Sequence, residues 1–341
     1  MDKNLLSKTA AAMVANGKGL LAADESSGTC NKRFQAAGVE TTEPNRRTYR
    51  DLLFTTQDIE KFISGVILFD ETIRENTVAT NEPFPQYLAK KGIIPGIKVD
   101  KGAKDLALCP GEEVTEGLDG LRERLAEYFK LGARFAKWRA VINIGANIPS
   151  WTCLRANAHA LARYSALCQE ASIVPIVEPE VLLDGDHTIE RCFEATEATL
   201  STLFATLREQ KVSLEHVILK ASMVVSGKDC PKQAGVEQVA QETVRCLKRT
   251  VPAALPGIVF LSGGQSDIDA TAHLNAMASM PDLPWPLTFS YSRALQNQAL
   301  KTWRGSPANV AAAQKAFHHR AQMNSLAAQG KYRPDWEERA A

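Results

Sequence analysis

Short apolar segments rich in β-branched residues alternate with longer amphipathic segments along the whole chain. This alternation is typical of strand–helix–strand units that build a parallel sheet. No internal sequence repeat or low-complexity linker interrupts it. The pattern predicts eight strands, at residues 19–24, 64–69, 93–99, 134–141, 173–181, 216–223, 257–261 and 287–291.

Apolar residues at helical spacing occupy the segments between these strands. The segment 119–131 places Leu121, Leu125 and Tyr128 on one face, and Gly132 follows it where a C-terminal cap belongs. The same spacing predicts further helices at 154–171 and 236–247.

Eight strand–helix alternations favour an α/β fold of the closed (β/α)₈ type, a TIM barrel, over an open doubly wound sheet. The length of 341 residues fits one such barrel. We therefore predict a single domain over 1–341, in which 303–341 form a C-terminal helix and tail. The active site of such a barrel lies at the carboxyl ends of the strands.

Composition and charge narrow the class of protein. The formal net charge of +1 gives no support for a nucleic-acid partner or an acidic membrane surface. No apolar run is long enough to span a bilayer, and the first residues lack the apolar core of a signal peptide. The seven cysteines form no Cys-x-x-Cys pair, and their odd number favours reduced thiols. Together these features predict a cytoplasmic enzyme with no membrane partner.

Charged residues interrupt several predicted strands near their carboxyl ends, where a buried parallel strand is normally apolar. Any one of them is equally compatible with a solvated strand end or a structural salt bridge. Their occurrence on five strands instead favours a convergent cluster at the barrel mouth, because isolated buried charges are unfavourable. Paired charges are two residues apart and so lie on one face of a strand. The residues are Asp24, Lys98, Asp100, Lys137, Arg139, Glu178, Glu180 and Lys220.

The cluster contains lysines and carboxylates but no histidine. None of the six histidines has the spacing of a metal-binding triad, so a metal-dependent mechanism is the weaker hypothesis. A lysine can activate a carbonyl by forming an imine when its amine is neutral, and apolar surroundings with a nearby cation favour that state. Lys220 lies on the most apolar of these strands, and Lys137 could supply the cation. Glu178 and Glu180 are candidates for proton transfer.

An anion site is predicted beside this cluster. Glycines in the run Ser262, Gly263, Gly264 let backbone amides approach an anion, and the loops after the seventh and eighth strands usually bind phosphate in barrels. Ser290 and Arg293 end the eighth strand and would add a hydroxyl and a guanidinium. A second basic set follows the first strand and is equally compatible with a solvated surface; it comprises Arg33, Arg46 and Arg47.

These residues lie in motifs that resemble the class I fructose-bisphosphate aldolase family. Seven segments match in the family's order, and the similarity runs from about residue 5 to about residue 333. The segments are LAADES (21–26), GIKVDKG (96–102), FAKWR (135–139), VEPE (177–180), ILK (218–220), FLSGGQS (260–266) and LTFSY (287–291).

The resemblance implies a metal-independent, reversible cleavage of fructose 1,6-bisphosphate without a cofactor, on a barrel that is usually a homotetramer. It implies that Lys220 forms the Schiff base and that Glu178 accepts the main proton, with Glu180 assisting. Asp24 and Lys137 would orient the substrate hydroxyls. The implied C1-phosphate contacts are Ser262, Gly263, Gly264, Ser290 and Arg293; those at the other phosphate are Ser26, Arg33 and Lys98, with Arg46 and Arg139 as further substrate contacts.

Two departures from the family pattern bear on these expectations. Ser292 stands where the family commonly has glycine, and a Cβ there would crowd the phosphate or require a different backbone. Animal members end in a longer tail with a terminal tyrosine that helps to protonate the enamine, whereas this chain ends at 336–341 without one.

Other functions stay open at the level of sequence. No residue distinguishes fructose 1,6-bisphosphate from sedoheptulose 1,7-bisphosphate. Another imine-forming barrel enzyme, such as a transaldolase or a dehydratase, would share the lysine but need one phosphate site. A non-catalytic phosphosugar-binding scaffold is the alternative from a different class.

Overall fold

Eight parallel strands close into a barrel in the computed structural model, which describes residues 1–337. Their order around the barrel is β1-β10-β9-β8-β7-β6-β3-β2. The predicted TIM barrel is therefore confirmed, with strand boundaries displaced by at most two residues. The strands are β1 (Gly19–Ala23), β2 (Ile63–Leu68), β3 (Ile94–Lys98), β6 (Phe135–Ile142), β7 (Val174–Val181), β8 (Ile218–Ala221), β9 (Ile258–Phe260) and β10 (Leu287–Tyr291).

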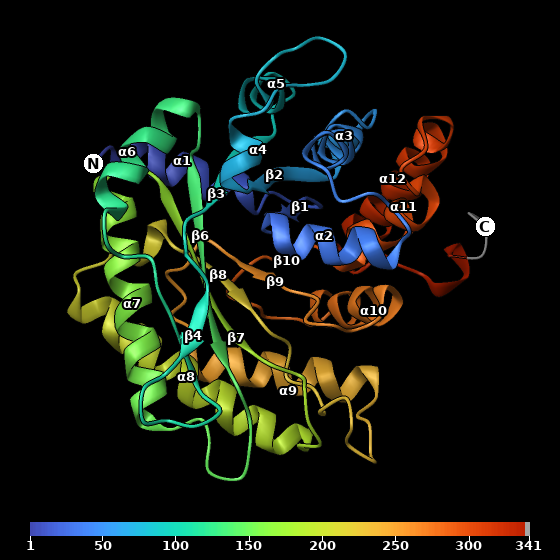
Figure 1. Ribbon diagram of the computed structural model, residues 1–341. Coiled ribbons are helices and arrows are strands. Elements are labelled where there is room, and N and C mark those ends of the chain that lie inside the picture. The colour runs from blue at the N-terminus through green and yellow to red at the C-terminus, as the bar shows by residue number, and fades with distance from the viewer. Residues whose placement is uncertain (338–341) are drawn as a thin grey trace.

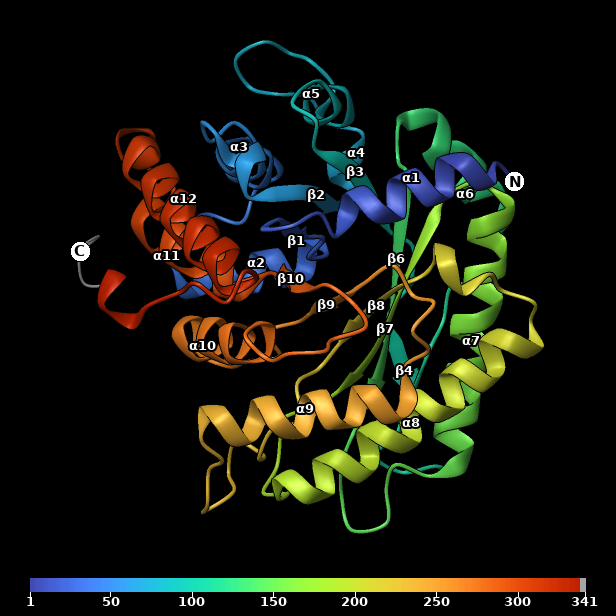
Figure 2. The same cartoon turned by 180° about the vertical axis from the view of Figure 1, so that it is seen from behind.

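Helices surround the strands, as two opposite views show (Figures 1 and 2). The three helices predicted from periodicity are confirmed, and Gly132 caps α6 at a φ of 112°, in the left-handed region that favours glycine. The helices are α1 (Lys3–Met13), α2 (Ser27–Ala36), α3 (Glu43–Phe54), α4 (Asp70–Ile73), α5 (Phe84–Lys90), α6 (Leu121–Leu131), α7 (Trp151–Glu170), α8 (Ile189–Glu209), α9 (Val236–Thr250), α10 (Asp267–Ala278), α11 (Arg293–Trp303) and α12 (Val310–Ala327).

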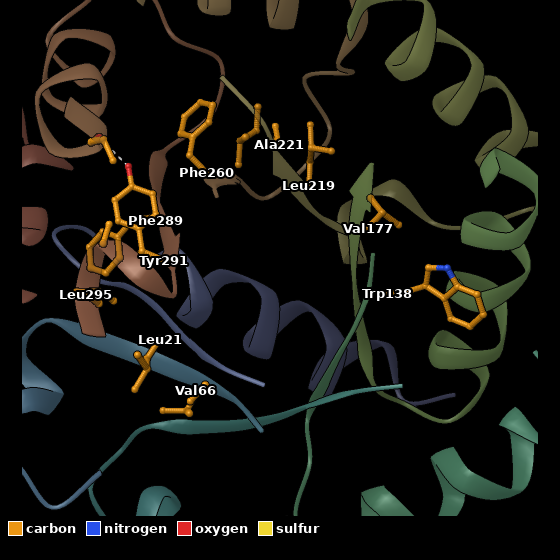
Figure 3. Close-up of a cluster of buried hydrophobic side chains, with 14 of the residues drawn as sticks. Leu21, Val66, Trp138, Val177, Leu219, Ala221, Phe260, Phe289, Tyr291 and Leu295 are labelled. Carbon is orange, nitrogen blue, oxygen red and sulfur yellow. Dashed lines mark hydrogen bonds between the residues drawn. The ribbon is translucent and has the colours of Figure 1, made fainter. Parts of the chain in front are cut away.

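Alternate residues of each strand point to opposite sides of the barrel wall, which gives two separate apolar layers. The outer layer packs between the strands and the helices, and Figure 3 shows part of it. Trp138, Val177 and Leu219 belong to this layer. Tyr291 lies there too, and its hydroxyl donates to the carbonyl of Ala270 on α10 at 2.8 Å. This layer fixes the strands to their helices and so fixes the direction of the inward-facing residues.

The inner layer fills the amino-terminal half of the barrel. Phe135, Ile176 and Ile218 belong to it, together with apolar side chains of α1. A Cβ on Gly96 would lie 2.2 Å from the Phe135 ring, so the glycine makes room for that ring. Going two residues further along the same face of these strands leads from apolar residues to charged ones at the mouth.

Two features of the fold lie outside the strand–helix pattern. A short antiparallel hairpin of β4 (Ala103–Asp105) and β5 (Glu113–Thr115) follows β3. In the predicted tail, α12 packs against α10 and α11. Residues 338–341 of that tail lie outside the described residues, and the single-domain assignment stays a prediction.

Candidate active site

The carboxyl ends of the strands surround a cavity of about 490 Å³ at the barrel mouth. Of the predicted site residues, the cavity wall includes all except Arg46 and Gly264. They reach it from seven strands and the segments that follow them, because parallel strands present their carboxyl ends at the same face. The wall residues from the prediction are Asp24, Ser26, Arg33, Lys98, Lys137, Arg139, Glu178, Glu180, Lys220, Ser262, Gly263, Ser290 and Arg293.

Two lysines and two carboxylates form the centre of the site. Lys220 Nζ lies 3.0 Å from Glu178 Oε1, and Lys137 Nζ lies 3.1 Å from Glu178 Oε2. Lys137 Nζ also lies 2.7 Å from Asp24 Oδ2. Lys220 and Glu178 are only 4% and 3% exposed, so these charges meet away from bulk water. The sequence suggested apolar neighbours for Lys220, and the structure adds a directly facing carboxylate.

Burial and charge act in opposite directions on these groups. Burial by itself would raise the pKa of Glu178, but the ammonium groups of Lys137 and Lys220 outweigh it and lower the pKa. The same two lysines hold the pKa of Asp24 well below its usual range despite burial. Burial would lower the pKa of Lys137, yet the carboxylates of Asp24 and Glu178 raise it. In the unliganded site, therefore, Glu178 and Asp24 are anionic and Lys137 is cationic at neutral pH.

The neighbouring wall carries a second set of charges. Glu180 pairs with the guanidinium of Arg139, which lies two residues beyond Lys137 on β6. The amide of Arg139 donates to Asp100 Oδ2 at 3.2 Å, and Lys98 Nζ lies 3.4 Å from Asp100 Oδ1. The predicted pairs of charged residues two positions apart therefore each lie on one side of the barrel wall. These pairs are Lys98 with Asp100, Lys137 with Arg139, and Glu178 with Glu180.

The predicted anion site lies at the ends of β9 and β10. Gly263 and Gly264 adopt φ values of 56° and 97°, which a residue with a Cβ rarely adopts. Gly264 lies beside the Arg293 guanidinium, since a Cβ built on it would be 3.5 Å from Nη2. Arg293 begins α11, whose free backbone amides favour an anion nearby. The buried Ser290 hydroxyl has no hydrogen-bond partner within residues 1–337 and is free to bind a ligand.

The basic residues after β1 divide into two groups. Arg33 lines the cavity and pairs with Glu25. Ser26 also lines it and caps α2, where its hydroxyl accepts from the Thr29 amide at 3.3 Å. Arg46 instead donates to both carboxylate oxygens of Glu71, each at 2.7 Å, outside the cavity wall. The structure does not bring Arg46 into the site.

Sequence reasoning did not select Glu25 or Ser292 as site residues, although both line the cavity. Glu25 directly follows Asp24, but a strand would turn it to the opposite face. It points inward because β1 ends at Ala23. Ser292 has a φ of −105°, outside the left-handed region, so its backbone does not require glycine.

A buried lysine faces a carboxylate, with a second lysine and an anion-binding loop beside it, and this arrangement fits a barrel enzyme that forms an imine with its substrate. Comparison with known proteins identifies the family. The family model for fructose-bisphosphate aldolase class-I matches residues 5–341.

Relatives match over nearly the whole chain. A probable fructose-bisphosphate aldolase class 1 from Xanthomonas campestris pv. campestris is 64% identical and covers 98% of this chain and 100% of its own length. The fructose-bisphosphate aldolase of Dictyostelium discoideum is 52% identical and covers 95% of this chain and 91% of its own. A structure of fructose-bisphosphate aldolase from Plasmodium falciparum, with TRAP and a small-molecule inhibitor, has a TM-score of 0.95 at 49% identity, covering 97% of this chain and 95% of that one. The chain belongs to the class I fructose-bisphosphate aldolase family and is a lyase.

Two further findings concern metals and membranes. Within residues 1–337, no three side chains of His, Cys, Asp or Glu are grouped so that they could hold a metal ion. None of the helices in the same residues combines the length and apolarity that a bilayer crossing needs.

Proposed function

We propose that this protein cleaves fructose 1,6-bisphosphate reversibly through a Schiff base on Lys220, without a metal ion or another cofactor. Membership of the family supports the reaction. The single observation that supports this assignment of the lysine is the 3.0 Å contact between Lys220 Nζ and Glu178 Oε1. A buried amine beside a carboxylate can lose a proton to it and then attack a carbonyl.

In the proposed reaction, the Lys220 amine adds to the C2 carbonyl of the ketose and gives a carbinolamine. Glu178 returns the proton it took from Lys220 to the departing hydroxyl, which leaves as water, and the nitrogen lone pair forms the C=N bond of an iminium ion. Glu178 takes the proton of the C4 hydroxyl while the C3–C4 bond breaks. The electrons of that bond enter the iminium and leave an enamine, and glyceraldehyde 3-phosphate departs. Protonation of the enamine at C3 and hydrolysis of the imine release dihydroxyacetone phosphate and free Lys220.

Three further residues assist these steps by stabilising charge, binding hydroxyls or transferring protons: Lys137, Asp24 and Glu180. Lys137 lies between two carboxylates, 2.7 Å from Asp24 and 3.1 Å from Glu178, and can stabilise the negative charge that develops on a substrate oxygen. Asp24 keeps Lys137 charged and accepts a hydrogen bond from a sugar hydroxyl. Glu180 assists proton transfer in the imine steps, and Arg139 holds Glu180 in place.

Two groups of residues would hold the two phosphates. The C1 phosphate would lie against Arg293, the free Ser290 hydroxyl and the α11 amino terminus. Ser262 and the two glycines would complete that site. The other phosphate would contact Ser26, Arg33 and Lys98. The pairing of Arg46 with Glu71 gives no support for its direct contact with substrate.

A cleavage assay with both fructose 1,6-bisphosphate and sedoheptulose 1,7-bisphosphate, each with and without EDTA, tests the function. We expect cleavage of the first substrate at the same rate in EDTA. The ratio of the two kcat/KM values measures the preference for chain length. Tight bisphosphate binding without cleavage would instead support a binding scaffold.

We infer from the family that the protein works in the cytoplasm as a homotetramer. One relative, from Arabidopsis thaliana, is named a cytosolic aldolase, and another, from Chlamydomonas reinhardtii, a chloroplastic one. Light scattering coupled to size-exclusion chromatography would measure the mass of the assembly against the 37.2 kDa chain.

A further inference from the structure

Glu25 is the centre of a hydrogen-bond cluster at the edge of the cavity. Arg50 Nη2 donates to Glu25 Oε2 at 2.6 Å, and Arg33 Nη1 donates to Oε1. Ser292 Oγ donates to Oε1 at 2.5 Å, and Gln296 Nε2 donates to it at 3.1 Å. The Glu25 side chain is only 7% exposed. These five residues are here called the Glu25 cluster.

The cluster joins elements that are far apart in the sequence. Glu25 follows β1, Arg33 lies on α2 and Ser292 lies between β10 and α11. Gln296 on α11 also donates to the carbonyl of Ala22 on β1 at 2.7 Å and to Ser292 Oγ at 3.2 Å. The Ser292 hydroxyl therefore donates to Glu25 after β1 and accepts from Gln296 on α11.

Ser292 reaches Arg33 directly. Arg33 Nη1 donates to Ser292 Oγ at 3.1 Å, in addition to its bond to Glu25. Both bonds use the same nitrogen. The Nε and Nη2 donors of Arg33 make no hydrogen bond to any residue that the structure describes. These two nitrogens form the edge of a guanidinium that binds a phosphate in a bidentate manner.

We propose that Ser292 is a positioning residue that, together with Glu25, holds Arg33 by Nη1 and keeps its Nε and Nη2 edge available for the substrate phosphate remote from the imine. The inference rests on the proposed cleavage reaction. This role requires the Ser292 hydroxyl, because with glycine or alanine at 292 Arg33 Nη1 would keep only its bond to Glu25. Without the second contact the guanidinium samples more orientations, and binding of the remote phosphate weakens.

Steady-state kinetics of Ser292→Ala with two substrates tests this role. Fructose 1,6-bisphosphate carries both phosphates, whereas fructose 1-phosphate lacks the remote one. We expect KM for the bisphosphate to rise by about 3- to 10-fold, the range for one lost hydrogen bond. KM for fructose 1-phosphate and both kcat values should stay within about twofold of the wild type. Ser292→Thr, which keeps a hydroxyl, should restore most of the bisphosphate affinity.

Two further variants complete the design. In an Arg33→Ala background, Ser292→Ala should cause no additional rise in KM, because the residue acts through Arg33. Ser201→Ala, at an exposed serine of α8, is the matched control. An unchanged ratio of the two KM values, whether both rise or neither does, overturns the proposal. So does a lower KM for the bisphosphate, which would mean that the cluster competes with the phosphate. Failure of the wild type to cleave the bisphosphate would refute the proposed reaction itself.

Discussion

Lys220 and Glu178 face each other across two adjacent strands, with Nζ 3.0 Å from Oε1. The pairing of β7 with β8 sets Ile176 opposite Ile218 and Val177 opposite Leu219, so the next residues along are Glu178 and Lys220. The strand register therefore determines this contact, and no flexible loop contributes to it. A proton can pass between the two groups without crossing bulk water, because both are almost fully buried.

Removing the amine tests the assignment of Lys220. Lys220→Ala should lower kcat by roughly 10³-fold or more, since the covalent step loses its nucleophile. Borohydride reduction in the presence of dihydroxyacetone phosphate should leave a stable adduct on Lys220 of the wild type and none on the variant, as measured by peptide mass spectrometry. Lys248→Ala, at an exposed lysine of α9, is the control and should retain full activity. An adduct on another lysine in the active wild type would contradict the assignment.

Glu178→Gln tests Glu178 as the main proton acceptor of the cleavage step. The amide has nearly the same size but cannot accept the C4 hydroxyl proton, so kcat for cleavage should fall by about 10²- to 10⁴-fold. Trapping of the imine by borohydride should still be detectable because Lys220 remains, but it should be slower because the amine has lost its proton acceptor. Glu209→Gln, at an exposed glutamate of α8, controls for the loss of charge. A kcat within tenfold of the wild type would assign the main proton acceptor to another residue.

Arg293→Ala should weaken binding at the C1 phosphate. A charge-assisted hydrogen bond contributes about 1.5–3 kcal/mol, which corresponds to a rise in KM of about 10- to 150-fold. The rise should be similar for fructose 1,6-bisphosphate and fructose 1-phosphate, because both carry this phosphate. Arg208→Ala, at an exposed arginine of α8, should leave both KM values unchanged. A rise limited to the bisphosphate would place Arg293 at the other phosphate.

The barrel and the centre of its site could be predicted from the sequence because both follow from local periodicity. The alternation of short apolar segments with longer amphipathic segments identified the strands. Charges two residues apart, such as Glu178 and Glu180, necessarily lie on one face of a strand. The closed order of the strands then brought these faces together.

The Glu25 cluster could not be predicted in this way. Its contacts depend on how α2, α3 and α11 pack around the end of β1, and no sequence spacing encodes that packing. The same limit applies to Arg46, whose basic charge suggested substrate binding. Its orientation is decided by Glu71, a residue beyond the next strand. The hairpin of β4 and β5 was missed because its strands are mostly polar and do not form the apolar segments by which the barrel strands were identified.

Glu75 gives the protein a predictable dependence of stability on pH. Burial, together with the neighbouring carboxylates of Glu43 and Glu71, raises the pKa of Glu75 from 4.5 to about 7. Between these two values the folded state binds more protons than the unfolded state, so this group's contribution to stability is fully present below pH 4.5 and is lost as the pH rises through 7. Glutamine stays neutral and avoids that loss.

Glu75→Gln should therefore increase the free energy of unfolding at pH 8 by about 1 kcal/mol, a value that allows for screening of this partly exposed side chain by water. At pH 5 the gain should be only a small part of this value, because most of the loss accumulates between pH 5 and pH 7, where Glu75 is ionised in the unfolded state and still protonated in the folded state. Urea unfolding at both pH values measures the difference, and Glu40→Gln, at an exposed glutamate, controls for the change in net charge. An equal gain at pH 5 and pH 8 would show that the effect comes from packing and that the titration of Glu75 does not cause it.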